Sequence, residues 1–315
     1  MSRPRIALTL GDPRGIGPEI TAAALARHAG LAAFTVFGPE GSGVEPEGSA
    51  FEAVGEWRPG GGAALAGRLA GNAIEAAAAA ALAGRVDALV TAPIDKNALQ
   101  LGGYAYAGHT EMLQRLTGAP DVAMLMVAER THLGGPLRVV LATTHIALSA
   151  VASALTADLL VRQGRLTAAG LRVGWGIPDP RIAFCALNPH ASDGGLFGDE
   201  EATVFAPALE ELRAGGVRAE GPFPADTVFV RALRGEFDAV VAPYHDVGMA
   251  AFKTASFGLG VNVTLGLPFP RTSPDHGTAA DIAGKGVADP TSMCEAIGLA
   301  ARLAMRGGGV GGDSE

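Results

Sequence analysis

Three short apolar segments, each followed closely by a histidine, constrain the fold of this chain more than any other feature. The segments and their histidines are residues 138–142 with His145, residues 181–187 with His190, and residues 238–242 with His245. Short apolar runs bounded by turn residues are typical of strands buried on both faces. A segment long enough for a helix separates each run from the next. We therefore predict parallel strands in an α/β fold, with their carboxyl ends at one edge of a sheet.

That edge is where open α/β sheets bind ligands. We predict that His145, His190 and His245 hold a divalent metal ion there and leave a coordination position for substrate. Three imidazoles suit zinc, and cobalt, manganese and magnesium are the alternatives. The competing interpretation is three unrelated histidines that cap strands or bond to the backbone.

Composition excludes several classes of protein. The chain has 315 residues, of which 48% are hydrophobic and 18% charged, and this favours a globular enzyme with two lobes. Its net charge of −8 argues against a nucleic-acid-coating protein, so an anionic substrate needs locally placed cations. No stretch predicts a membrane span. The start of the sequence has no signal-peptide pattern, and the two cysteines, Cys185 and Cys294, exclude a disulfide framework, so we expect a cytoplasmic protein.

Strand and helix patterns alternate along most of the chain. The glycines after the first strand, at positions 11, 15 and 17, match neither common phosphate-binding loop. No G-x-S-x-G motif is present, which argues against a serine hydrolase. Residues 38–62 are rich in glycine, proline and glutamate and predict a surface loop. The alanine-rich residues 63–83 predict a closely packed helix.

Candidate anion-binding residues follow the third histidine. Lys253, Asn262 and Arg271 lie in a stretch rich in glycine and proline, where Lys and Arg suit phosphate or carboxylate. His109 and Thr110 begin a predicted helix, whose free N–H groups favour an anion. The alternatives are solvated surface cations and a simple helix cap at Thr110.

Two carboxylates are candidates for proton transfer. Asp246 adjoins His245, and Asp226 lies in a proline-containing turn. A carboxylate beside a ligating imidazole can fix its tautomer or accept a proton. The positions of Asp246 and Asp226 in the sequence do not show which of them transfers the proton.

Seven further motifs follow one another along the chain: GDP-x-GIGPE at 11–19, TAPI-x-K at 91–96, GHTE at 108–111, ATTH at 142–145, LNPHA at 187–191, YHD at 244–246 and GVNVTLGLPF at 260–269. Together and in this order they resemble the 4-hydroxythreonine-4-phosphate dehydrogenase family of pyridoxal phosphate biosynthesis. Arg14 stands where the family has alanine. The resemblance implies a homodimer whose active site is completed by the partner subunit. It also assigns the metal to His145, His190 and His245, and the substrate contacts to positions 109, 110, 253, 262 and 271.

A wider resemblance concerns the cofactor. Residues 275–286 are similar to the segment of isopropylmalate and isocitrate dehydrogenases that holds the adenosine end of NAD or NADP. This implies cofactor contacts at His276, Gly277, Thr278 and Asp281. It also implies two α/β/α lobes with largely parallel sheets and an interlobe active site. We expect the first lobe at 1–108 and 275–315, and the second, with the metal histidines and dimer interface, at 109–274.

The resemblance names the substrate as 4-phospho-hydroxy-L-threonine. The reaction expected is metal-assisted oxidation of a secondary alcohol by NAD(P), with Asp246 or Asp226 as base, followed by β-decarboxylation. Three alternatives remain: a sister dehydrogenase for D-threonate or D-erythronate 4-phosphate or an aromatic dihydrodiol, a metal-dependent hydrolase, and a catalytically silent binding protein.

Overall fold

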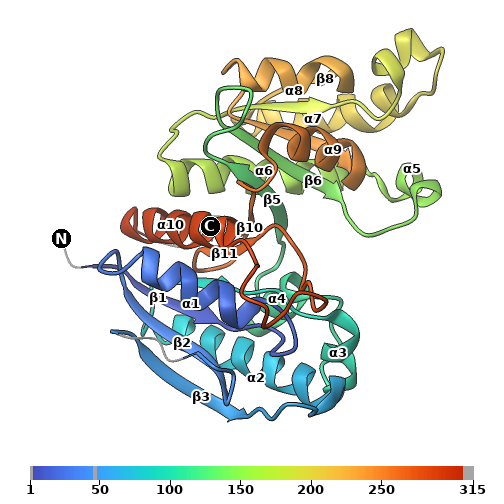
Figure 1. Ribbon diagram of the computed structural model, residues 1–315. Helices are drawn as coiled ribbons and strands as arrows, with labels where there is room; N and C mark the ends of the chain where they lie inside the picture. Colours follow the sequence, from blue (N-terminus) through green and yellow to red (C-terminus); the bar gives the residue numbers. More distant parts are fainter. Residues whose placement is uncertain (1–2, 45–47, 308–315) are drawn as a thin grey trace. The chain divides into compact units, whose positions relative to one another are not determined.

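The computed structural model describes residues 3–44 and 48–307, which form two compact units (Figure 1). Unit 1 contains the described residues of Met1–Pro120 and Val261–Gly309, and unit 2 is Asp121–Gly260. In each unit, helices cover both faces of a mostly parallel sheet. The predicted α/β class, with α/β/α layers, is confirmed. No helix within the described ranges has the length and apolar character needed to cross a membrane.

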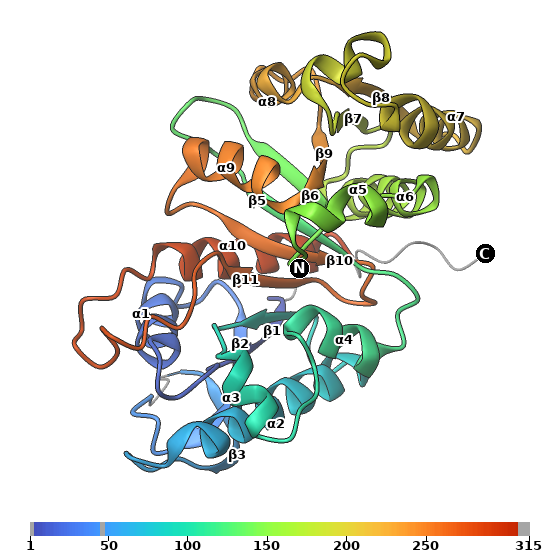
Figure 2. The ribbon, with the colours of Figure 1, turned by 90° about the vertical axis from the view of Figure 1, so that its right-hand side faces the viewer.

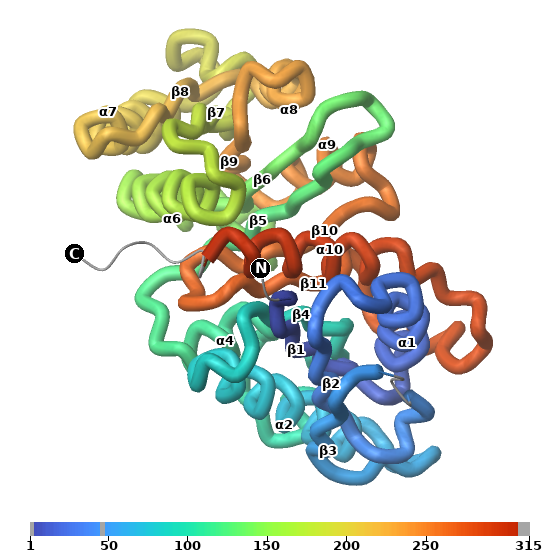
Figure 3. Tube along the Cα trace, turned by 90° about the vertical axis from the view of Figure 1, so that its left-hand side faces the viewer, coloured from blue at the N-terminus to red at the C-terminus, as the bar shows by residue number. Residues whose placement is uncertain are grey.

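Unit 1 is built on a sheet with strand order β3-β2-β1-β4-β11-β10. Its strands are β1 Arg5–Thr9, β2 Ala33–Glu40, β3 Ala50–Glu56, β4 Ala88–Thr91, β10 Val261–Leu265 and β11 Arg271–Pro274. Within this unit, β10 and β11 form an antiparallel pair, and the other strand pairs are parallel. The helices are α1 Gly17–Arg27, α2 Gly62–Leu82, α3 Lys96–Leu101, α4 His109–Thr117 and α10 Thr291–Met305. Helix α2 packs on one face of the sheet, and α10 with α1 covers the other (Figure 2 and Figure 3).

Unit 2 has the strand order β5-β6-β9-β7-β8. The strands are β5 Ala123–Ala128, β6 Leu137–Thr143, β7 Arg181–Cys185, β8 Arg218–Phe223 and β9 Ala239–Tyr244. All pairs are parallel except β5 with β6. Its α-helices are α5 Val151–Ala154, α6 Ala157–Trp175, α7 Ala206–Ala214, α8 Ala225–Leu233 and α9 His245–Ser256. Helix α6 packs on one face, and α8 and α9 pack on the other.

The three histidine-terminated segments form β6, β9 and β7, which are neighbours in the sheet and parallel, as predicted. Their apolar side chains are almost completely buried; Val139, Val241 and Phe184 are at most 1% exposed. Burial on both faces is what excludes polar residues from these strands until their carboxyl ends. Polar side chains therefore gather at that edge.

Several predicted elements differ from the structure. The loop predicted at 38–62 contains the end of β2 and the whole of β3, whose mixed and mostly exposed side chains hide the strand signal; residues 45–47 lie outside the described residues. The polar stretch after the third histidine folds into α9, β10 and β11.

The division into units also differs from the predicted crossings at 108/109 and 274/275. Helix α4 packs against α2, and β11 pairs with β4, so residues 109–120 and 261–274 belong to unit 1. These long-range contacts leave no local sequence signal.

Helix α2 packs closely through its small residues, as its composition predicted. A Cβ atom on Gly67 would lie 1.7 Å from the carbonyl oxygen of Ala98 in α3. A Cβ on Gly71 would lie 2.0 Å from the ring of Tyr104. The approach of α3 and the following loop to α2 thus requires glycine at these positions.

We predict that Gly67→Ala lowers the free energy of unfolding by about 1–3 kcal/mol, because backbone atoms of α3 must move. Gly298→Ala in α10 is the matched control, since its Cβ would meet only His28 Nε2, at 3.9 Å. The control should be neutral or stabilising by up to about 1 kcal/mol through helix propensity. Thermal and urea unfolding measure both variants, and equal effects would contradict the packing argument.

Candidate functional site

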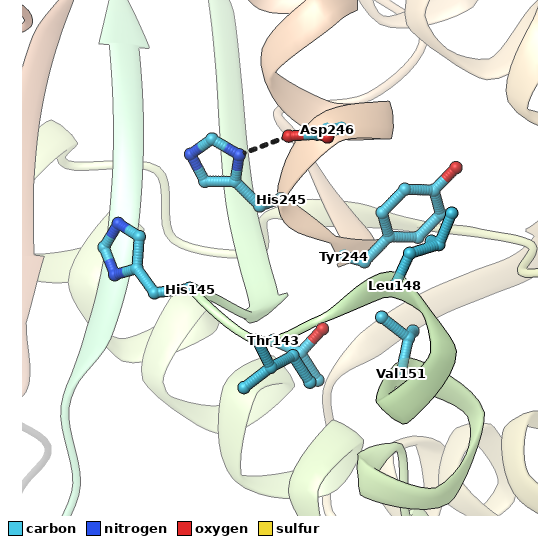
Figure 4. A pocket seen from close by; sticks show the side chains of 8 residues that line it. Thr143, His145, Leu148, Val151, Tyr244, His245 and Asp246 are labelled. Carbon is cyan, nitrogen blue, oxygen red and sulfur yellow. Dashed lines mark hydrogen bonds and ion pairs between the residues drawn. The ribbon is translucent and has the colours of Figure 1, made fainter.

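Two of the three predicted metal-binding histidines lie together in unit 2. Thr143 at the end of β6 is paired with Tyr244 at the end of β9, and the Thr143 hydroxyl donates a 2.8 Å hydrogen bond to the Pro243 carbonyl. The chains that leave these paired ends carry His145 and His245. Their ring centroids are 5.6 Å apart, with 39° between the ring planes (Figure 4).

The pair lines a pocket of about 170 Å³ at the carboxyl edge of the sheet. The residues that line it are Thr143, His145, Ile146, Leu148, Val151, Tyr244, His245 and Asp246. Figure 4 shows Tyr244 with Leu148 and Val151 on the side away from the two rings. The pocket thus has a polar side formed by imidazoles and a mainly apolar side.

Asp246 orients the ring of His245. Nδ1 of His245 donates to Oδ1 of Asp246 over 2.7 Å, which leaves Nε2 to bind another group. A carboxylate on the far nitrogen is the usual partner of a metal-ligating imidazole. The pair and its carboxylate therefore fit a divalent cation as two ligands. Within residues 3–44 and 48–307, however, no group of three His, Cys, Asp or Glu side chains has metal-site spacing.

His190 stands apart from this pocket. It follows β7, the neighbour of β9, but it is exposed and is not among the residues that line the pocket. Its backbone is left-handed, with φ 52°, as is that of His145, with φ 54°. A non-glycine residue in this region costs on the order of 1–3 kcal/mol and persists where surrounding structure holds it, most often at functional sites.

The other candidates in unit 2 differ in position. Asp246 lines the pocket, whereas Asp226 is exposed near the start of α8 and does not line it. Lys253 is half-buried on α9, two turns after His245. Of the two carboxylates, Asp246 is thus the one that contacts His245, a candidate metal-binding residue.

The remaining predicted substrate residues belong to unit 1, where Arg271 is the central charge. Its side chain is 2% exposed, and its guanidinium donates to the hydroxyls of Thr91, at 2.6 and 3.2 Å, and Thr264, at 3.1 Å. Burial lowers the pKa of Arg271 to about 10, and the charge of Glu111 opposes this shift. No carboxylate lies within ion-pair distance of Arg271 in the described part of the chain. A buried cation with only hydroxyl partners suits an anionic ligand.

His109 begins α4 beside this charge, and Thr110 follows it in the first turn. Burial, and then the charges of Arg271 and Lys96, hold the pKa of His109 well below its ordinary value. Nε2 of His109 is buried without a hydrogen-bond partner, and so is Oδ1 of Asn262 on β10. Buried polar atoms of this kind are usually satisfied, so unpartnered ones mark a place for a polar group.

The predicted cofactor segment contacts the glycine loop of unit 1. The amide of Ile16 donates to the Thr278 carbonyl over 2.8 Å, and the amide of Gly286 donates to Glu19 over 3.2 Å. A pocket of about 280 Å³ adjoins the segment and is lined by Pro13, Arg14, Gly15, Pro18, Glu19, Ala22, Ser42, Gly43, Val44, Ala283 and Gly284. His276, Gly277, Thr278 and Asp281 are not among these lining residues. Arg14, the departure from the family pattern, is paired with Asp12 and Asp95.

Several residues of these sites were not predicted. Thr91 and Thr264 hold Arg271, and Tyr244 forms a wall of the histidine pocket. Thr91 and Tyr244 lie in motifs that the sequence displays, but nothing in a sequence pairs the Thr91 hydroxyl with a guanidinium 180 residues away. The buried side chain of Glu201 also has no local signal in the sequence.

The fold and the imidazole pair define a two-unit α/β protein of the dehydrogenase-like type. The family model of pyridoxal phosphate biosynthetic protein PdxA matches residues 21–300, and the chain belongs to this family. A 4-hydroxythreonine-4-phosphate dehydrogenase of Aromatoleum aromaticum is 43% identical over 96% of this chain and 97% of its own length.

Two solved structures are also similar. A 4-hydroxythreonine-4-phosphate dehydrogenase of Klebsiella pneumoniae has a TM-score of 0.83 and 40% identity, covering 96% of this chain and 99% of that one. A terephthalate 1,2-cis-dihydrodiol dehydrogenase of Burkholderia xenovorans has a TM-score of 0.67 and 29% identity, covering 95% and 98%. The family resemblance inferred from the motifs is confirmed.

The lowered pKa of His109 predicts a pH dependence of stability. In the folded protein the His109 ring stays neutral, while in the unfolded chain its pKa is about 6.5. Below that pH the unfolded chain therefore binds more protons than the folded protein. The contribution of neutral His109 to stability is fully present above about pH 6.5, and it is lost as the pH falls toward the lower pKa of the folded state. His109→Gln should reduce the slope of unfolding free energy between pH 7 and 5 by up to about 1.4 kcal/mol per pH unit. Urea unfolding at several pH values measures it, and an unchanged slope would contradict the shift.

Proposed function

We propose that the chain oxidises 4-phospho-hydroxy-L-threonine with NAD or NADP, using a divalent metal ion. The product, 2-amino-3-oxo-4-phosphonooxybutanoate, then loses carbon dioxide to give 3-amino-2-oxopropyl phosphate. The observation that carries the proposal is the His145–His245 pair with Asp246, in a chain 43% identical to a named dehydrogenase over nearly its full length.

The metal would be held by His145 and His245, with His190 as the predicted third ligand. When bound, such an ion supplies positive charge that favours loss of a hydroxyl proton. Zinc suits imidazole ligands, and cobalt, manganese or magnesium are alternatives. Asp246 holds His245 with Nε2 directed away from the carboxylate, which keeps the ring in one tautomer and orientation.

Proton transfer and anion binding fall to different residues. We assign the proton acceptor to Asp246 rather than Asp226, because Asp246 lines the pocket and Asp226 does not. Arg271, His109, Thr110, Asn262 and Lys253 are the proposed contacts for the phosphate and carboxylate of the substrate. The buried guanidinium supports this assignment, since an anion would compensate its charge.

The nicotinamide cofactor is proposed to bind at His276, Gly277, Thr278 and Asp281. Its support is the hydrogen bonding of this segment to the glycine loop at the start of α1. Homodimerisation is proposed from the family resemblance. A cytoplasmic location is proposed because Cys185 and Cys294 are both free thiols.

A second candidate function is oxidation of an aromatic dihydrodiol. The similarity to the Burkholderia xenovorans dihydrodiol dehydrogenase favours it, because that enzyme has the same fold at 29% identity. The choice depends on the anion contacts, since a terephthalate dihydrodiol would offer Arg271 a carboxylate in place of a phosphate.

The proposed activity is tested by following the absorbance of the reduced nicotinamide cofactor, with Zn²⁺ and either NAD or NADP present. We expect turnover of 4-phospho-hydroxy-L-threonine to exceed that of D-erythronate 4-phosphate, D-threonate 4-phosphate and a cis-dihydrodiol. Preference for one of the other substrates would reassign the chain within its fold group. Release of phosphate without nicotinamide reduction would favour a hydrolase.

Matched variants distinguish the roles of the carboxylates of Asp246 and Asp226. Asp246→Asn should lower kcat/KM by about 10–100-fold, because the amide can neither accept the proton nor hold His245 in one tautomer. Asp226→Asn should remain within about threefold of the wild type, since an exposed side chain outside the pocket is replaced. The reverse ranking would place the base at Asp226.

A further inference from the structure

The loop that carries His190 is held by one buried carboxylate. Glu201 is 6% exposed and begins a π-helical turn, Glu201–Phe205. Phe205, at the end of this turn, is completely buried and anchors it in the core of unit 2. Single π-turns of this kind occur frequently at functional sites.

Glu201 accepts hydrogen bonds from both sides of His190. Its Oε1 accepts from the backbone amides of Leu187, at 2.9 Å, and Asn188, at 2.8 Å. Its Oε2 accepts from the Asn188 side-chain amide, at 2.9 Å, and from the Ser192 hydroxyl. A carboxylate has about four acceptor positions, so this one is fully used.

The charge of Glu201 is maintained despite its burial. Burial alone would raise the pKa of Glu201, but hydrogen bonds from Asn188 and Ser192 outweigh it and the pKa is lowered. An ionised acceptor makes stronger hydrogen bonds than a neutral one. The four contacts therefore form a strong clamp, which we name the Glu201 clamp.

The loop needs such a clamp because its backbone conformation is unfavourable. Five successive residues, from His190 to Gly194, have φ between 45° and 68°, and four of them are not glycine. Its backbone hydrogen bonds include those from Ala191 to the carbonyl of Asn188 and from Phe197 to the carbonyl of Ser192, each 3.2 Å. The Glu201 clamp holds the chain two and three residues before His190 and two residues after it, so it fixes the backbone from which the histidine projects.

We propose that Glu201 is a positioning residue that orients His190 for binding the divalent metal ion. The proposal rests on the proposed function, in which His190 is the third ligand. Glu201 itself has no part in hydride or proton transfer. Its role is to hold a strained loop in one conformation, so that the entropy of ordering the loop is not lost when the cation binds.

The test uses the full chain with Glu201→Gln, which keeps the size of the side chain but places N–H donors against the Asn188 amide and the Ser192 hydroxyl. Ser192→Ala removes one contact only and serves if the first variant folds poorly. Asp238→Asn is the matched control. Asp238 accepts from the amide of Arg181, at 2.7 Å, and from its guanidinium, at the opposite end of β7.

Three readouts are compared: melting temperature, hydrogen exchange of the amides of residues 188–197, and the affinity for Zn²⁺ alone by calorimetry. We expect Glu201→Gln to speed exchange at least about tenfold and to weaken Zn²⁺ binding about 10–100-fold. Ser192→Ala should show smaller changes in the same direction. Asp238→Asn should lower the melting temperature, with exchange at 188–197 and Zn²⁺ affinity within about threefold of wild type.

The role is refuted if Glu201→Gln lowers the melting temperature while exchange and Zn²⁺ affinity match those of Asp238→Asn. Glu201 would then be merely structural. Failure of the proposed function looks different: the wild-type chain itself would bind no Zn²⁺ and reduce no nicotinamide. In that case the exchange comparison alone decides whether the Glu201 clamp holds the loop.

Discussion

Parallel hydrogen bonding among β6, β9 and β7 is the constraint on which the histidine site depends. Because the strands run in one direction and are paired up to Thr143 and Tyr244, their carboxyl ends meet at one edge. Their buried side chains must be apolar, so the first polar residues able to meet a ligand are those just beyond the ends. The 5.6 Å separation of the His145 and His245 rings follows from this register.

Charge burial distinguishes the two units. In unit 2 the carboxylate of Glu201 is buried and fully satisfied by hydrogen bonds from the loop that carries His190. In unit 1 the guanidinium of Arg271 is buried against hydroxyl groups. A satisfied buried charge stabilises a conformation, whereas a buried charge whose direct hydrogen-bond partners are neutral favours an oppositely charged ligand. One charge therefore supports the His190 loop, and the other suits an anionic ligand.

Much of this architecture could be predicted because the signals are local. The three strands, the alanine-rich helix and the contact of Asp246 with its neighbour His245 follow from short-range pattern. The edge strand β3 was missed because its side chains alternate weakly and are largely exposed. The polar region after His245 hid α9, β10 and β11, since residues suited to binding weaken the hydrophobic pattern that marks a helix or strand.

The sequence by itself determined the α/β class, the family and the identity of the residues at the strand ends, because apolar runs and motifs are properties of neighbouring residues. Only the tertiary structure decided which of those residues meet. It paired His145 with His245 and left His190 on a left-handed loop outside their pocket. It also joined Arg271 to Thr91 and Glu201 to Leu187. Such contacts link distant positions through the sheet and the core, and their energy depends on burial and geometry that no local pattern contains.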